Sequence, residues 1–199
     1  MLTLVLMAVL NKGDLVDKVV NAYGGAAAWE KVASFHETGS VTSKMRSGKG
    51  KLDRTWQSPN KLRVQIVYPS HTEVRDVDGD KGTSNGEPAE GMMLDAMRLQ
   101  AARLALPLLL VQKRSALKVV DATHIEVPLD GAMTLTVEVD GSGRIIKSTG
   151  KATGVEFSTT YSDFRTVDGL VFAFREENSA QGMPTGDNEI AKVDVNLRK

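Results

Sequence analysis

Apolar residues recur at helical spacing near the N-terminus of the chain. Asp14 can cap a helix whose apolar stripe runs over residues 15–23, and Gly24-Gly25 ends it. A second short helical segment is predicted over residues 26–32, around Trp29. These two segments are the only helices expected before the pattern changes.

From residue 33 onward, apolar and polar residues alternate. The alternation is clearest over residues 62–68, 133–140, 155–161, 170–174 and 191–197. A period of two predicts strands with one apolar and one wet face, which is typical of antiparallel sheets. Four dipeptides of the hairpin type separate such strands: Asp78-Gly79, Asp130-Gly131, Asp140-Gly141 and Asp168-Gly169. No regular succession of strand and long helix is present, so doubly wound and barrel α/β folds are not expected.

One internal segment, residues 89–106, returns to a helical period. Met93, Met97 and Leu104 fall on one side of this helix and Arg103 on the other, and Pro107 ends it before the apolar run 108–111. The pattern therefore predicts a mainly β (α+β) fold: one antiparallel sheet covered by an N-terminal helix and an internal helical lid. We expect a single domain over residues 1–199.

Composition and charge exclude several classes of function and of chemical site. The chain has 199 residues, with 25 basic and 25 acidic side chains and no cysteine. Zero net charge argues against a nucleic-acid surface, because phosphate binding needs an excess of Lys and Arg. The absence of cysteine excludes disulfides, thiolate metal sites and a cysteine nucleophile. The apolar run 2–10 is too short to span a bilayer, and two interpretations stay open: the remnant of a signal peptide or the start of the first helix.

Two chemical motifs coincide in one loop. Residues 82–86 match the G-x-S-x-G pattern of serine hydrolases, with Ser84 as nucleophile, but a solvated turn precedes it and no long helix follows. The same loop partly matches a calcium loop, with Lys81 at the position that normally needs Gly. The oxygen ligands of that candidate are Asp76, Asp78, Asp80, Ser84 and Glu87. The three histidines lie far apart and predict no metal or catalytic site, and no cofactor is expected.

A sheet that is too large for its helical lid leaves an apolar cavity suited to an acyl chain. Methionines on the lid would repack around ligands of different shape. The residues expected to line this cavity are Leu62, Val64, Ile66, Tyr68, Met93, Met97, Leu104, Phe157, Tyr161, Phe172 and Phe174. In the alternative interpretation the same side chains fill the core completely, and an exposed surface binds a protein partner.

Short segments in sequence order carry a family resemblance over nearly the whole chain. They are residues 32–36, 50–52, 58–63, 74–79, 133–148 and 161–174. Their order resembles the LolA/LolB-like lipoprotein-localisation family, periplasmic carriers of lipoproteins and related apolar cargo. The resemblance implies a curved half-barrel lidded by helices, no catalytic activity, and a periplasmic location. It also implies lipid or lipoprotein acyl chains as ligand and membrane-bound lipoprotein-handling proteins as partners.

Three positions depart from the family pattern. Ser58 stands where the carrier has an arginine before the Pro-Asn turn, Leu62 where it has an aromatic residue, and residues 82–86 replace another aromatic position. Lipoprotein cargo in particular is therefore open, and the expected function is a carrier or sensor of an acyl chain or similar amphiphile. An interaction module and a hydrolase using Ser84 are the alternatives.

Overall fold

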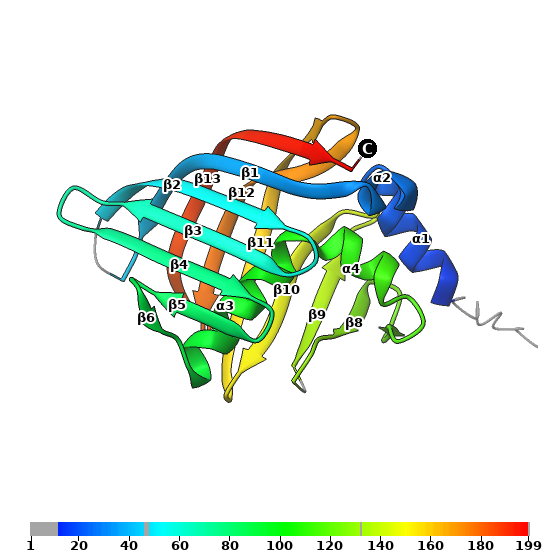
Figure 1. Cartoon of the computed structure of the whole chain (residues 1–199). Coiled ribbons are helices and arrows are strands. Elements are labelled where there is room, and N and C mark those ends of the chain that lie inside the picture. Colours follow the sequence, from blue (N-terminus) through cyan, green and yellow to red (C-terminus); the bar gives the residue numbers. More distant parts are fainter. Residues whose placement is uncertain (1–11, 46–47, 132, 199) are drawn as a thin grey trace, which may run out of the picture.

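The computed structural model, which describes residues 12–45, 48–131 and 133–198, consists mainly of β-strands (Figure 1). The strands are β1 (Val32–Ser43), β2 (Gly48–Gln57), β3 (Lys61–Val67), β4 (Thr72–Asp78), β5 (Lys81–Ser84), β6 (Glu87–Pro88), β7 (Lys118–Val119), β8 (His124–Pro128), β9 (Thr134–Val139), β10 (Ile145–Ala152), β11 (Val155–Val167), β12 (Leu170–Ala180) and β13 (Met183–Leu197). The helices are α1 (Lys12–Ala22), α2 (Ala26–Glu30), α3 (Gly91–Leu104) and α4 (Leu106–Gln112).

All 13 described strands form one antiparallel sheet. Their order is β6-β5-β4-β3-β2-β1-β13-β12-β11-β10-β9-β8-β7. The first and last long strands, β1 and β13, pair at its centre, so the two ends of the chain are joined in the middle of the sheet. The predicted mainly β fold with antiparallel pairing is confirmed.

The expected hairpin dipeptides do connect consecutive strands. Asp168 and Gly169 both have positive φ, 50° and 79°, between the paired residues Val167 and Leu170. Positive φ at both central residues is the geometry of a type I′ turn, which matches the right-handed twist of the strands. The longest connection between consecutive described strands is the one from β6 to β7, which contains α3 and α4.

The sheet curves around α3 and α4, while α1 and α2 lie at one end of it (Figure 1). Pro107 lies in the first turn of α4, whereas the sequence predicts only that it ends the helix over residues 89–106. Proline fits there because the first turn of a helix has no intrahelical partner for its N–H. The apolar run 108–111 is thereby a buried helix, with Leu110 fully enclosed. The helical cover has two parts, α3 and α4.

Candidate ligand-binding site

The helix α3 spans the opening between the two sides of the curved sheet. A Cβ atom on Gly82, in β5, would lie 3.1 Å from Leu94 Cδ1 and 3.1 Å from Met97 Cε of α3. A Cβ atom on Gly150, in β10, would lie 2.8 Å from Leu99 Cδ2 of the same helix. Glycine at these two strand positions lets the helix approach β5 and β10, on the two sides of the curved sheet, closely, so α3 covers the concave side.

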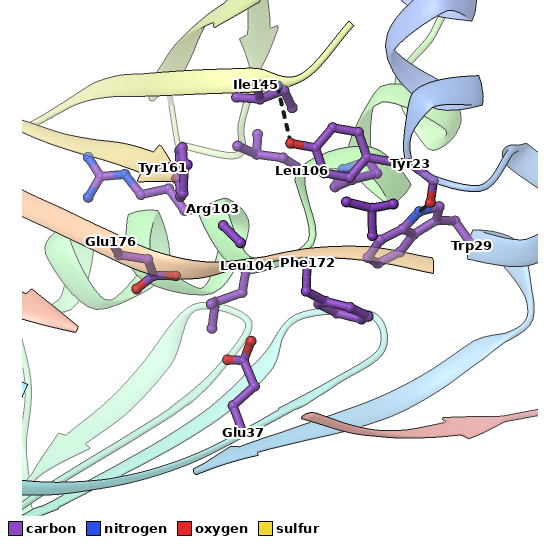
Figure 2. A pocket seen from close by; sticks show the side chains of 13 residues that line it. Tyr23, Trp29, Glu37, Arg103, Leu104, Leu106, Ile145, Tyr161, Phe172 and Glu176 are labelled. Atoms are coloured by element: carbon purple, nitrogen blue, oxygen red, sulfur yellow. Dashed lines mark hydrogen bonds between the residues drawn. The ribbon is translucent and has the colours of Figure 1, made fainter. Parts of the chain in front are cut away.

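A cavity of about 50 Å³ lies beneath the junction of α3 and α4 (Figure 2). Its walls come from the turn after α1, from α2, from the helical cover and from the concave face of the sheet. The lining residues are Tyr23, Trp29, Glu37, Arg103, Leu104, Leu106, Pro107, Ile145, Tyr161, Val171, Phe172, Ala173 and Glu176. One or two water molecules fill such a volume, whereas small-molecule pockets typically measure roughly 300–1,000 Å³. At this place the half-barrel is almost completely filled by its own side chains.

One end of the cavity is aromatic. The Trp29 and Phe172 ring centroids are 5.6 Å apart, and Phe172 in turn lies 5.3 Å from Phe35 in an edge-to-face arrangement. Trp29 Nε1 donates a hydrogen bond of 2.9 Å to the Tyr23 carbonyl oxygen. The Tyr23 hydroxyl accepts one of 3.1 Å from the Ile145 backbone N–H (Figure 2). The polar atoms of both rings thus have protein partners, and burial raises the pKa of Tyr23.

The other end of the cavity is polar. A row of polar side chains, which we call the polar row, crosses adjacent strands from β2 to β10 on the concave face. It consists of Arg54, Glu37, Asn188, Glu176, Tyr161 and Ser148. Arg54 donates bonds of 2.8 and 2.7 Å to the two oxygens of Glu176, and its Nε pairs with Glu37. Asn188 Nδ2 donates 2.8 Å to Glu176, and the hydroxyls of Tyr161 and Ser148 are 2.7 Å apart. Buried charges of this kind persist only when each is paired and hydrogen-bonded.

Burial and pairing push the pKa values in the polar row apart. Burial raises the pKa of Glu37 above its ordinary value, and the single contact with Arg54 does not offset it. Burial also acts on Glu176, but Arg54 and Asn188 outweigh it, so the pKa of Glu176 is lowered. Burial raises the pKa of Tyr161 to about 12, against the opposing effect of Arg103. Glu176 is therefore the carboxylate that balances Arg54, and Glu37 is the more readily protonated one.

Arg103, at the C-terminal end of α3, points into the polar end near Tyr161 and Glu176 (Figure 2). Its Nη2 donates a hydrogen bond of 2.6 Å to the Phe157 carbonyl oxygen of β11. Its Nε is enclosed and has no hydrogen-bond partner. Burial lowers the pKa of this guanidinium, although an arginine still keeps its charge at any physiological pH. A charged group with an unused donor therefore faces the cavity.

The structure brings three of the eleven predicted lining residues to this cavity: Leu104, Tyr161 and Phe172. Leu62, Val64, Ile66 and Met97 are buried in the core around it without reaching the cavity wall. The other four predicted residues lie elsewhere. Tyr68 stacks on His71, Phe157 is half-buried and offers only its carbonyl to Arg103, Phe174 lies beneath the Arg165 guanidinium, and Met93 is 50% exposed.

Sequence reasoning missed most of the polar lining. Arg103 was expected on the outer side of its helix, and Glu37, Arg54 and Glu176 were not singled out. A signal exists for Arg54, because it lies between Leu52 and Trp56 at the strand period and all three are buried. Nothing in the helical period marks Arg103, which turns inward because α3 ends there and the chain bends into α4.

The loop with two chemical motifs forms a β-hairpin. Ser84 ends β5, where it pairs with Arg75 and Glu87 through the backbone. Asp76 and Asp78 lie in β4 and pair with Arg63 at 2.7 Å and Lys61 at 2.7 Å. The carboxylates are thus engaged by strand neighbours and do not converge as calcium ligands would. Across residues 12–45, 48–131 and 133–198, no three His, Asp or Glu side chains are grouped so that they could hold a metal ion.

The histidines each have a local partner. His36 lies 3.1 Å from Asp53, His71 lies 3.2 Å from Glu73, and His124 lies 3.0 Å from Asp121. None of these contacts includes Ser84. In the part of the chain that the structure describes, none of the helices combines the length and the apolar character needed to cross a bilayer.

Similar solved structures share this architecture over almost the whole chain. A domain assigned to outer membrane lipoprotein-sorting proteins from Vibrio parahaemolyticus matches with a TM-score of 0.54 and 8% identity, covering 93% of each chain. A LolA superfamily protein from Nitrosomonas europaea matches with a TM-score of 0.55 and 8% identity, covering 94% of each. The fold is LolA-like.

A DUF1329 family protein from Desulfovibrio piger ATCC 29098 also matches the LolA-like fold, with a TM-score of 0.51, 8% identity and 92% coverage of each chain. No protein-family model and no curated protein matches the sequence. At this identity the likeness concerns the fold. The resemblance inferred from the short sequence segments is confirmed at that level.

Proposed function

We propose that this protein is a non-enzymatic carrier or sensor that binds an amphiphile, a lipid or a lipoprotein acyl chain, inside its half-barrel. The observation that carries the proposal is the cavity between the aromatic residues of the concave face and the helical cover of a LolA-like fold. A periplasmic location and membrane-bound lipoprotein-handling partners accompany this proposal by analogy with the fold.

Binding an acyl chain requires the helical cover to move, because the cavity holds only about 50 Å³. Few polar contacts hold α3 to the sheet and its turns. Arg98 donates 3.3 Å to the Asp130 carbonyl, Arg103 donates 2.6 Å to the Phe157 carbonyl, and Thr153 donates 3.3 Å to Asp95. Arg75 of β4 also donates a long hydrogen bond of 3.5 Å to Gln100 of α3. The buried side chains of α3 (Met97, Leu99 and Ala101) are apolar, and an acyl chain can replace apolar contacts at little cost.

The chemistry of the interior also favours binding over catalysis. Glu37 and Glu176 are both engaged by Arg54, and no nucleophile–base pair accompanies them at the cavity. Ser84, the candidate nucleophile, lies on β5 and does not line the cavity. We therefore place no reaction in the half-barrel.

Native mass spectrometry of the protein as purified, followed by denaturing extraction, tests the proposal. We expect a mass above the 21.5 kDa of the bare chain, with the excess lost on denaturation and recovered as lipid. If the purified protein is empty, we expect added dodecyl amphiphiles to give a mass excess equal to the mass of the bound amphiphile. A bare mass before and after these additions would contradict it.

The small cavity supports a second candidate, a protein-interaction module with a filled core. Met92 and Met93 at the start of α3 are 47% and 50% exposed, as surface contacts of such a module would be. The absence of amphiphile binding, together with the capture of a defined protein partner, would favour this candidate.

A further inference from the structure

The buried cations of the concave face differ in how completely they are neutralised. Arg54 contacts two carboxylates, Glu37 and Glu176. Arg103 contacts no carboxylate within ion-pair distance among the described residues, and its one hydrogen bond goes to a neutral backbone carbonyl. From this difference, and resting on the proposed function above, we infer that the amphiphile carries an anionic head group that Arg103 binds within the half-barrel.

The unused donor of Arg103 supports this inference. Within residues 12–45, 48–131 and 133–198, only Arg103 Nε and Asp187 Oδ1 are buried side-chain polar atoms without a hydrogen bond. Of the two, only Arg103 lines the cavity. An enclosed donor on a charged group is costly unless it is satisfied, so its persistence is expected at a position where a ligand supplies the acceptor.

The acidic groups that face the cavity direct their hydrogen bonds away from Arg103. Glu176 accepts two hydrogen bonds from Arg54 and one from Asn188, and it acts on Arg103 only through the electrostatic attraction between their charges. Glu37 pairs with Arg54 Nε on the opposite side of the cavity from Arg103 (Figure 2). Tyr161 adds a hydroxyl beside Arg103, which is a further hydrogen-bonding group for an oxyanion.

The layout of the cavity fixes the orientation of the ligand. Arg103, Tyr161 and Glu176 lie at one end, and Tyr23, Trp29 and Phe172 lie at the other (Figure 2). An amphiphile with a single acidic group satisfies both ends when its head lies against Arg103 and its tail extends along the aromatic rings. A guanidinium binds a carboxylate or a phosphate through two parallel hydrogen bonds, so both are suitable heads. A neutral ester or alcohol offers Arg103 no charge-assisted hydrogen bond.

The test compares three ligands with the same dodecyl tail: laurate, dodecyl phosphate and dodecanol. Each is titrated below its micelle concentration against the full chain by calorimetry. We expect at least one of the two anions to bind about 10-fold or more tightly than dodecanol, as a charge-assisted hydrogen bond predicts. The tighter anion identifies the head as carboxylate or phosphate.

Two variants on the same helix locate the effect. Arg103→Gln is expected to remove the preference for the anion while dodecanol affinity changes little. Arg98→Gln is the matched control, because Arg98 also donates to a backbone carbonyl from α3 but lies outside the cavity. It is expected to keep the preference. If Arg103→Gln does not fold, Arg103→Lys is used instead. Lysine keeps the positive charge but cannot form the two parallel hydrogen bonds of a guanidinium, so we expect this variant to show a reduced preference for the anion.

Equal affinity for the anions and dodecanol in the unaltered protein would overturn the head-group assignment and leave the carrier proposal standing. A preference that persists in Arg103→Gln would overturn the role of Arg103. Absence of binding by all three dodecyl ligands would overturn both this inference and the proposed function, so the two failures are distinguishable.

Discussion

Arg54 and Glu176 form a two-point ion pair across the concave face, with nitrogen–oxygen distances of 2.8 and 2.7 Å. Their strands, β2 and β12, are not neighbours, because β1 and β13 lie between them. The pair therefore joins the N-terminal and C-terminal halves of the sheet across its centre. Both side chains are almost fully buried, so the ion pair lies in the interior of the half-barrel.

The first prediction concerns this ion pair. Arg54→Met leaves Glu37 and Glu176 buried without their ion-pair partner, which typically costs about 3–5 kcal/mol of unfolding free energy. Urea unfolding at neutral pH measures the loss. Arg63→Met is the matched control, because its pair with Asp76 is exposed and is expected to contribute less than about 1 kcal/mol. Equal effects of the two substitutions would contradict the role given to the polar row.

The second prediction concerns the pH dependence that Glu37 imposes. Burial raises its pKa in the folded protein, so the stability that this group contributes is present below its unfolded pKa and is lost as pH rises through the folded value. Gln has no such titration. Glu37→Gln is therefore expected to gain stability relative to the unaltered protein as pH rises from 4 to 8, by about 1.4 kcal/mol for each unit of raised pKa.

Unfolding by urea at a series of pH values follows this difference. Glu177→Gln, on the exposed face of the same strand as Glu176, is the control and is expected to give a flatter difference. A Glu37→Gln protein that instead lost stability relative to the parent over this range would show that the carboxylate is stabilised by Arg54 more than it is penalised by burial.

The third prediction concerns the bulge between β1 and β13. The register shifts between Thr38 and Gly39, and a Cβ atom on Gly39 would lie 2.1 Å from the Glu189 carbonyl oxygen. Because the obstacle is backbone, Gly39→Ala must displace a central strand. We expect the free energy of unfolding to fall by at least the amount seen when cores are overpacked, about 1–3 kcal/mol. Gly141→Ala meets nothing within 4 Å and is expected to be neutral or slightly stabilising. Thermal unfolding of the two variants gives the comparison.

Much of the fold could be predicted from the sequence, because a sheet with one apolar and one solvated face requires apolar and polar residues to alternate along each strand. The alternation over residues 62–68 and 170–174 predicts β3 and the start of β12, and Asp168-Gly169 predicts the turn between β11 and β12. The division of the helical cover into α3 and α4 was less accessible, since Pro107 can either end one helix or begin the next.

The site was harder to predict than the fold. Charged residues on strands are usually placed outward, yet Arg54 and Glu176 turn inward because they satisfy each other across two intervening strands. That pairing joins residues 122 positions apart, and local periodicity carries no information about it. Phe174 shows the same limit in the opposite sense: its type predicts a cavity wall, but it packs beneath Arg165 at 4.3 Å.

The fourth prediction tests most directly whether α3 is a lid over a ligand site. The chain contains no cysteine, so spin labels can be attached at introduced cysteines without altering native thiols. Met93→Cys on α3 and Val67→Cys on β3 are both exposed positions, 50% and 42%. Val67→Cys with Met183→Cys, 69% exposed, forms a control pair within the sheet.

Electron–electron double resonance then gives the distance distributions with and without laurate, dodecyl phosphate or dodecanol. A ligand that enters the half-barrel must displace α3, so we expect at least one amphiphile to shift or broaden the Met93–Val67 distribution and to leave the Val67–Met183 distribution unchanged. Distributions that stay the same for both pairs at saturating concentrations of all three amphiphiles would contradict the lid and the cavity together.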